Sequence, residues 1–242
     1  MRWRLAGACL AAGLFFLVLG RAAAAAELRI PDDLATPRGA AYVLGLLTLI
    51  ALGPSLLVML TSFTRIAVVL SLLRGAVASP QVPPNQVVVG LALFLTVFVM
   101  APTLGAVNRD AVRPYLAGEI DGGQALARAE GHLREFMLPR TRERTLKMFL
   151  DYAGLRVGEP AETPMAALVP AFVVSELQSA FEMGFLMILP FLVIDLAVGT
   201  VLMSFGMIML PPVMVSMPLK VLVFLLAGGW DAVVGALLSS YK

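Results

Sequence analysis

The sequence PFLVIDLAVGTVLMSFGMIMLPP, residues Pro190–Pro212, is a long apolar segment that is bounded by prolines and contains one acid, Asp195. A transmembrane helix needs about 20 predominantly apolar residues, and this segment is long enough. Proline interrupts the hydrogen bonds of a helix interior, so the flanking prolines should delimit the helix. With similar segments elsewhere, it predicts an all-α, multi-span membrane protein with helices broken at proline and glycine.

Apolar sequence fills most of the C-terminal region, residues 164–242. Its prolines divide the region into three predicted helical pieces: Met165–Leu189, Phe191–Met209 and Leu219–Ser240. We expect the first two pieces to form a long broken helix and a span. The third is long enough for a further span.

The region 42–107 holds the remaining apolar stretches, Tyr42–Leu60 and Val87–Val107. Between them, Ile66–Leu73 is apolar but too short to cross a membrane, and it predicts a buried or re-entrant helix. Together with the C-terminal pieces, these stretches predict four spans.

The composition agrees with a membrane location. Only 14% of the residues are charged and 60% are hydrophobic, whereas about 25% of a typical soluble chain is charged. The net charge is +2. No concentrated basic face is evident, so the sequence does not favour nucleic-acid binding.

Residues 108–163 carry many more charged side chains than the apolar stretches on either side of them. They hold the only histidine, His132, and about half of all charged side chains, interleaved with apolar residues at spacings that suit amphipathic helices. We expect a polar, water-facing helical hairpin here.

The first 26 residues resemble a cleavable signal peptide. Arg2 and Arg4 precede the apolar stretch Leu5–Leu19, and the small residues Ala22–Ala26 follow it, as in secretory signals. The alternative is an uncleaved anchor helix. Cleavage would leave residues 27–41 as a polar leader outside the cytoplasm. Four spans would then place 108–163 outside and Arg65, Arg74 and Lys220 inside, as the positive-inside rule favours.

Three carboxylates interrupt the C-terminal apolar sequence: Glu176, Glu182 and Asp195. Charges at membrane depth are costly unless they are paired, protonated or hydrated. Glu176 and Glu182 lie about 120° apart round a helix, so they do not form a catalytic pair on a straight helix. We expect them to pair with basic residues of a neighbouring helix or subunit, or else to relay protons.

Methionines gather late in the chain, and Met207 and Met209 precede Pro211. Methionine is an ordinary gap-filler in apolar cores. Alternatively, an irregular loop before the prolines could direct flexible thioethers into one lumen, since such backbone at membrane depth is tolerated where it lines a cavity. No glycine-rich phosphate loop, HExxH or GxSxG occurs, and we expect neither an enzyme nor a cofactor or metal site.

Several strings in order resemble one family, the FliP/SctR family of type III export-gate proteins, and its flagellar branch in particular. They are MLTSFTRI (59–66), PPNQV (83–87), GLALFLT (90–96), FML (136–138), TRE (141–143), SEL (175–177), PFLVIDL (190–196) and GMIMLPP (206–212).

The resemblance implies a helically arranged, ring-like pore of several such copies with FliR and FliQ, and with FlhA and FlhB as neighbours. It implies a conduit for unfolded flagellar subunits in the bacterial inner membrane, at the flagellar basal body. Met207, Ile208 and Met209 fall on the family's methionine loop, a gasket of the closed pore. Relatives often have a third methionine at position 208, which indicates that flexible apolar bulk is the requirement.

The resemblance also matches Arg142 and Glu176 to charged positions that pair between neighbouring copies. The main alternative function is an ion-coupled secondary transporter with Asp195 and Glu176 as coupling carboxylates in broken helices.

Overall fold

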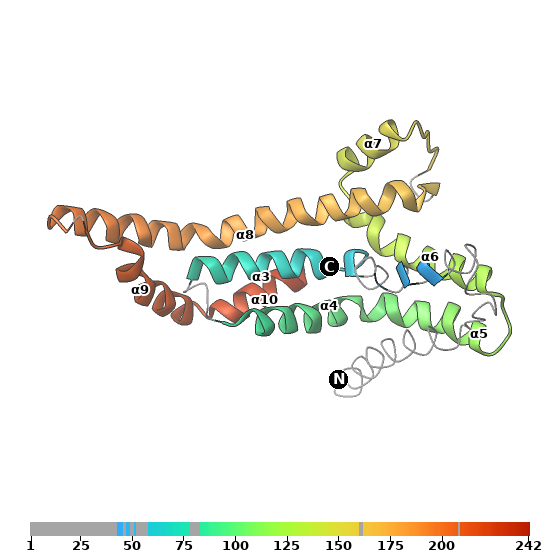
Figure 1. Cartoon of the computed structure of the whole chain (residues 1–242), viewed down its shortest axis with the longest axis horizontal. Helices are drawn as coiled ribbons and strands as arrows, with labels where there is room; N and C mark the ends of the chain where they lie inside the picture. The colour runs from blue at the N-terminus through green and yellow to red at the C-terminus, as the bar shows by residue number, and fades with distance from the viewer. Residues whose placement is uncertain are drawn as a thin grey trace. The chain divides into compact units, whose positions relative to one another are not determined.

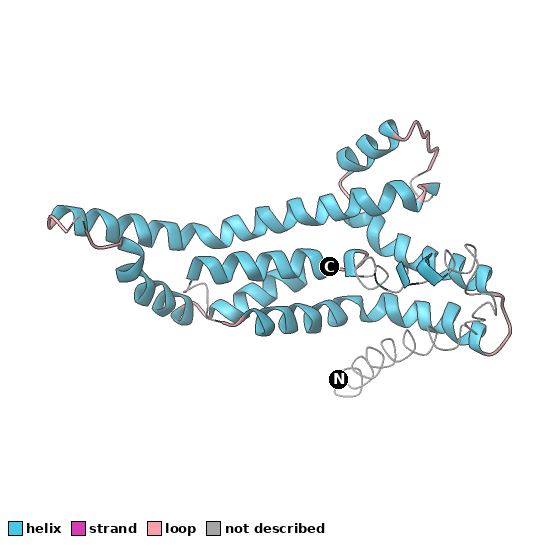
Figure 2. Cartoon of the chain, in the orientation of Figure 1, coloured by secondary structure: helices cyan, strands magenta, loops and turns pink. Residues whose placement is uncertain are grey.

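The computed structural model describes residues 43–45, 47–48, 51, 58–77, 83–159, 162–207 and 209–242. These residues form helices and connecting loops, with no strand among them (Figure 2). The predicted all-α fold is therefore confirmed. The predicted signal peptide, 1–26, and polar leader, 27–41, lie outside the described residues, as does most of the predicted span Tyr42–Leu60.

The chain divides into two compact units. The first unit combines the described part of Met1–Thr61 with Met100–Met137. The second combines Ser62–Val99 with Leu138–Lys242. The division falls after Met137, so the polar stretch 108–163 contributes to both units.

The first unit contains only the N-terminal part of the predicted amphipathic region, because the helix Glu143–Tyr152 belongs to the second unit. The C-terminal part of α4 (Asn85–Val107) leads into the π-helix η1 (Asn108–Val112), the short helix α5 (Arg113–Leu116) and α6 (Gly122–Met137). The Asp121 carboxylate begins α6 by accepting a hydrogen bond from the Gln124 backbone N–H at 2.9 Å, which satisfies one of the free donors at a helix N-terminus.

The second unit is built around one long helix, α8 (Met165–Ser204). It packs against α3, η2, α7 and α9, and α10 packs against α9 (Figure 1). The bounds of these helices are α3 (Phe63–Val77), η2 (Leu138–Arg140), α7 (Glu143–Tyr152), α9 (Pro212–Leu226) and α10 (Gly229–Ser239).

Helix α3 is the short buried helix that the stretch Ile66–Leu73 predicted. Its buried side chains recur every three or four residues, which forms one apolar stripe. The stripe faces α8, whose small and aromatic side chains complete the core of the second unit. The core residues of the two helices are Ile66, Val69, Leu70, Leu73 and Val77 with Ala167, Leu168, Ala171 and Phe172.

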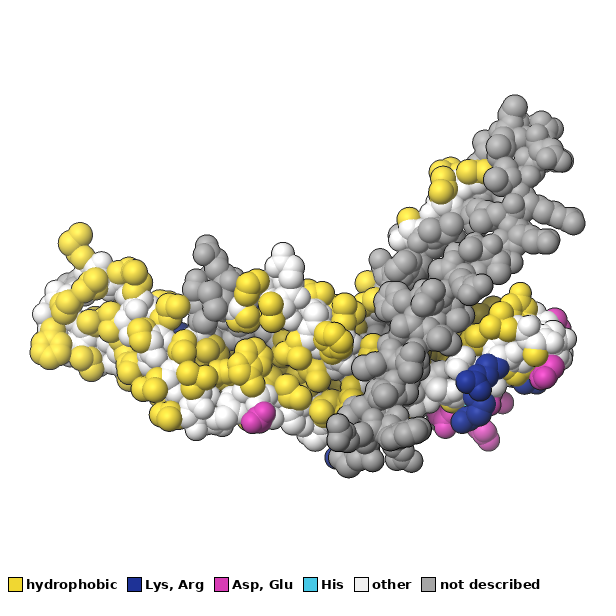
Figure 3. All heavy atoms as spheres, turned by 90° about the horizontal axis from the view of Figure 1, so that it is seen from below, with side chains coloured by type: hydrophobic (Ala, Val, Ile, Leu, Met, Phe, Trp, Pro, Cys, Tyr) yellow, Lys and Arg dark blue, Asp and Glu magenta, His cyan; other side chains and the backbone are white. Residues whose placement is uncertain are grey.

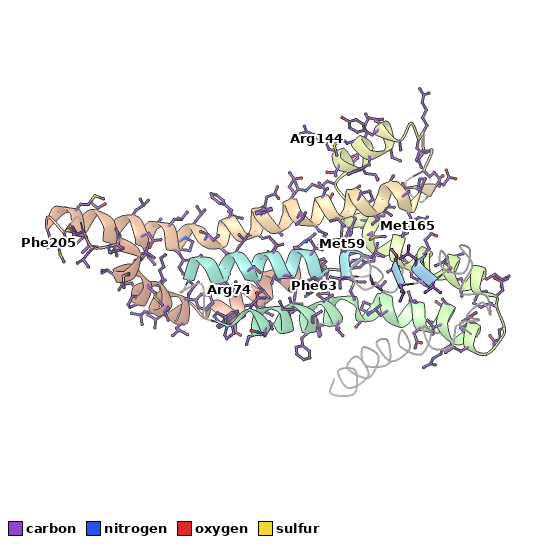
Figure 4. The ribbon with its side chains drawn as sticks, in the orientation of Figure 1. Met59, Phe63, Arg74, Arg144, Met165 and Phe205 are labelled. Carbon is purple, nitrogen blue, oxygen red and sulfur yellow. The ribbon has the colours of Figure 1, made fainter. Side chains whose placement is uncertain are left out.

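The predicted break at Pro190 is wrong. Helix α8 continues through both Pro170 and Pro190, and Figure 4 labels Met165 at its first residue and Phe205 just past its last. A proline removes one hydrogen bond from a helix. In apolar surroundings, however, leaving helical geometry would expose many more backbone groups without partners, and helices at membrane depth tolerate proline for this reason.

The predicted single helix Leu219–Ser240 is also wrong. Helix α9 starts at Pro212, runs through Pro218 and ends at Leu226, and α10 is bent from it by 64°. The bend lies at Gly228, whose φ of 61° is left-handed, a conformation that glycine adopts at low cost.

Two helical stretches of the described chain are long and apolar enough to cross a membrane: Asn85–Leu116 and Met165–Ser204. The bent pair α9 and α10 would make a third. Because α8 runs without a break from Met165 to Ser204, the C-terminal region does not divide into spans as we predicted. Figure 3 shows the apolar character of these helices on one face, where mostly hydrophobic side chains lie over α9 and the adjoining end of α8.

Candidate functional site

Several charged residues in the apolar helices of the second unit are paired within the chain. Arg65 lies in the first turn of α3 (Figure 4 labels Phe63 at its start), and Glu176 lies on α8. Their side chains form an ion pair. Glu176 is 0% exposed and Arg65 6% exposed, so each depends on the other to offset the cost of a buried charge.

The C-terminal end of the chain completes this cluster. The Tyr241 hydroxyl donates a hydrogen bond to Glu176 Oε2 at 2.6 Å. The Arg65 guanidinium lies 4.4 Å from the centroid of the Tyr241 ring, within the range of a cation–π interaction. Arg65 Nη1 also donates to the Ser240 carbonyl at 3.3 Å and to Ser240 Oγ at 3.1 Å. In Figure 1 the C-terminus accordingly lies beside the start of α3.

Arg140 of η2 holds the same end from another side. Its Nη2 donates to the Tyr241 carbonyl at 2.8 Å. Burial lowers the pKa of Arg140, although an arginine stays protonated in proteins. Burial, and next the charge of Glu176, raise the pKa of Tyr241 far above its usual range. The Tyr241 hydroxyl therefore keeps its proton and acts as a hydrogen-bond donor.

Within the chain, Arg142 pairs with Glu182 and not with Glu176, so the expected pairing of Arg142 with Glu176 between neighbouring copies remains a prediction. Arg142 Nη2 donates to Glu182 Oε2 at 2.5 Å and to Ser179 Oγ at 3.4 Å, and its backbone N–H donates to Ser175 Oγ at 3.0 Å. The physical reason is the helical offset of about 120° between Glu176 and Glu182: Glu176 meets Arg65 of α3, whereas Glu182 meets Arg142 at the start of α7.

Asp195 links α8 to α9. Lys220 Nζ donates to Asp195 Oδ2 at 2.6 Å, and Ser216 Oγ donates to Oδ1 at 2.5 Å. Ser216 and Lys220 are both buried and lie one turn apart on α9, so one face of that helix satisfies both oxygens of the carboxylate. The sequence singled out Asp195 but not these partners.

The predicted methionine loop joins α8 to α9. The Met207 N–H donates to the Leu202 carbonyl at 3.0 Å, and Gly206 has a φ of 73°, which together close α8 with a left-handed glycine. Met207 is 43% exposed and Met209 98% exposed. Ile208 lies outside the described residues. The gasket role of all three residues remains a prediction.

Sequence reasoning also missed Arg65 as a site residue and gave no role to Tyr241. The position of Arg65 directly before an apolar stretch was a usable signal, because a charge at membrane depth needs a partner. No local pattern marked Tyr241, since the hydrogen-bond partners of its hydroxyl lie 65 or more residues away in the sequence. Among the described residues, no three His, Cys, Asp or Glu side chains lie so that they could hold a metal ion.

Comparison with known proteins gives one consistent result. The sequence profile of the FliP family matches residues 46–237. The "Flagellar biosynthetic protein FliP" of Aquifex aeolicus is 49% identical over 81% of this chain and 83% of its own length. Proteins of the same description from Bacillus subtilis and Cereibacter sphaeroides are each 46% identical, over 81% and 98% of this chain and 89% and 80% of their own lengths. The chain therefore belongs to the FliP family.

Proposed function

We propose that the chain is a pore-forming subunit of the flagellar type III protein export gate in the bacterial inner membrane, at the flagellar basal body. The relatives are described as flagellar biosynthetic proteins, and family membership supports a role in flagellar export. In this proposal the chain conducts unfolded flagellar subunits and carries out no chemistry of its own.

The observation that carries the proposal is the uncovered apolar surface of the second unit. Outside its contacts with α3, α7 and α9, helix α8 exposes a series of large hydrophobic side chains, and α9 does the same. They include Phe181, Phe185, Leu186, Val193, Leu196, Met203, Val213, Met214 and Leu226. A surface of this extent needs lipid or protein to cover it. In our proposal the cover is further copies of the chain, together with FliR and FliQ, with FlhA and FlhB as neighbours.

The charge pairs fit a structural subunit better than the alternative, an ion-coupled transporter. A coupling carboxylate must exchange its partner for an ion or proton during each cycle. Each carboxylate of α8 is instead held by a basic side chain of the same chain: Glu176 by Arg65, Glu182 by Arg142 and Asp195 by Lys220. Buried or linking pairs of this kind tie helices together.

The α8–α9 loop is proposed as the seal of the closed pore. Its methionines are exposed in the single chain, so they are available to pack against the same loop in other copies. A ring of flexible apolar side chains would exclude water and ions, as hydrophobic constrictions do in channels.

Size distinguishes a gate subunit from a transporter. The chain is expressed with FliR and FliQ, extracted in detergent, and sized by light scattering. A large complex with several copies of the chain supports the gate, whereas a monomer or dimer would contradict it. In a strain that lacks the chain, the wild-type gene should restore secretion of flagellar subunits into the medium.

Conductance tests the seal. Replacing Met207, Ile208 and Met209 with serine should raise the ion conductance of membranes that contain the complex. The matched control is Met148→Ser on α7, a methionine with 43% exposure like that of Met207 but outside the loop. Unchanged conductance with an intact loop-variant complex would refute the seal.

A further inference from the structure

The penultimate residue of the chain reaches into the buried charge cluster. Tyr241 is 7% exposed, whereas the final residue, Lys242, is exposed. We propose that Tyr241 is the positioning residue of the Arg65–Glu176 ion pair, so that this pair is held in place only when the C-terminal end of the chain is docked. The proposal concerns the chain itself and does not depend on its role in an export gate.

The first argument is that both carboxylate oxygens of Glu176 require a partner. Its carboxylate is wholly buried, and such a group is stable only when both oxygens are paired or hydrogen-bonded. Arg65 Nη2 donates to Oε1. The Tyr241 hydroxyl donates to Oε2 at 2.6 Å, so the second oxygen is satisfied by the C-terminal end of the chain.

The second argument is that the buried guanidinium of Arg65 requires more contacts than Glu176 alone provides. One of its three nitrogens, Nε, has no hydrogen-bond partner among the described residues. Nη1 donates to the carbonyl and hydroxyl of Ser240, and the Tyr241 ring lies against the guanidinium plane. The C-terminal end therefore provides a second set of contacts for Arg65, beyond the carboxylate of Glu176.

The docked end is itself fixed on several sides. Arg140 donates to the Tyr241 carbonyl at 2.8 Å, and the Tyr241 hydroxyl lies 3.3 Å from the Ser62 carbonyl. One turn earlier, Leu237 of α10 is fully buried. These contacts unite α3, α8, η2 and α10.

The test removes only the hydroxyl. Tyr241→Phe keeps the ring over Arg65 but leaves Glu176 Oε2 without this donor. The full chain is purified in detergent, with its partners, and its apparent melting temperature is measured. We expect a fall of roughly 5 °C, since a hydrogen bond to a charged group is lost in a chain of this size. Tyr152→Phe makes the same change at a side chain that is 87% exposed and should leave the melting temperature unchanged. An unchanged value for Tyr241→Phe would overturn the proposal.

A double-mutant cycle identifies the partner of the hydroxyl. In an Arg65→Met/Glu176→Leu background, the buried pair is replaced by apolar side chains and needs no donor. Tyr241→Phe should then cost less than a third of its effect in the wild-type chain. An equal cost in both backgrounds would show that the hydroxyl serves the Ser62 carbonyl and would overturn the proposal.

A digestion experiment tests the docking of the C-terminal end directly in the wild-type chain. Carboxypeptidase treatment of the purified wild-type chain should remove Lys242 and stop before Tyr241, as read by mass spectrometry. Tyr241→Ala, which loses the ring as well, should allow digestion into α10. Rapid removal of Tyr241 from the wild-type chain would contradict a docked C-terminal end.

Discussion

Gly184 of α8 lies so close to the side chain of Leu72 of α3 that a side chain on residue 184 would displace Leu72. A Cβ placed on Gly184 would overlap Leu72 Cδ1 and would lie 3.3 Å from Leu72 Cβ. The glycine therefore sets how closely the two central helices of the second unit approach one another. This contact leads to the first prediction.

Gly184→Val should separate α3 from α8. Overpacking of a well-packed contact costs about 1–3 kcal/mol, which should lower the apparent melting temperature of the purified chain and its amount in the membrane. Gly90→Val is the matched control, because a Cβ on Gly90 of α4 meets nothing within 4 Å among the described residues. Equal stability of the two variants would mean that the α3–α8 spacing is not limited by Gly184.

Glu176 and Glu182 of α8 should differ sharply in their tolerance of substitution. Glu182 and Arg142 are 57% and 34% exposed at their side chains, and an exposed ion pair contributes about 0–1 kcal/mol. Glu182→Gln should therefore reduce assembly only slightly. Glu176→Gln should be severe, because it leaves buried Arg65 uncompensated at a cost of about 3–5 kcal/mol. The yield of assembled complex measures both.

Charge exchange tests the same pairing in a second way. Exchanging Arg142 and Glu182 for one another should restore most of what either single reversal loses. Combining Glu176→Arg with Arg142→Glu should restore nothing, because these two residues have different partners. Rescue of the second combination would indicate an additional pair between neighbouring copies.

The ion pairs of Glu176 and Glu182 show which features of the site could be predicted from the sequence and which could not. Helical periodicity gave the angle between Glu176 and Glu182, and it correctly predicted that the two acids do not share one site. It could not identify what each one faces, because Arg65 lies 111 residues from Glu176 in the sequence. The short buried helix α3 was predictable, since a brief apolar stretch between turn residues has few other solutions.

The predicted break at Pro211-Pro212 is confirmed, because α8 ends at Ser204 and α9 begins at Pro212, whereas those at Pro190 and Pro218 failed. In water, a proline makes an interior helical position costly, and the released backbone groups can bind solvent. Around Pro190 the neighbouring side chains are apolar, so no alternative partners exist for the backbone and α8 continues. The real break, at Gly228, depends on a left-handed conformation and on the Phe224 ring. That ring occupies the space where a Cβ on Gly229 would lie.

The Asp195–Lys220 pair should be essential to the α8–α9 packing. In Lys220→Met, the Ser216 hydroxyl is the one remaining hydrogen-bond donor to Asp195 among the described residues. Removal of one partner of such an ion pair costs about 3 kcal/mol of stability. Asp195→Asn combined with Lys220→Met removes both charges and should recover more than half of the lost complex. A double variant no better than Lys220→Met would show that Asp195 has a role beyond pairing.

Leucine at positions 207 and 209 should preserve the seal that serine destroys. Leucine and methionine have similar volumes and hydrophobicity, and exchanges between them usually cost less than about 1.5 kcal/mol. Leucine lacks the thioether but keeps the apolar bulk, as the residue already present at position 208 does. Membranes that contain the Met207→Leu/Met209→Leu complex should therefore keep the low ion conductance of the wild type. A leak as large as that of Met207→Ser/Met209→Ser would show that the sulfur, or the greater flexibility of methionine, is what the closed loop requires.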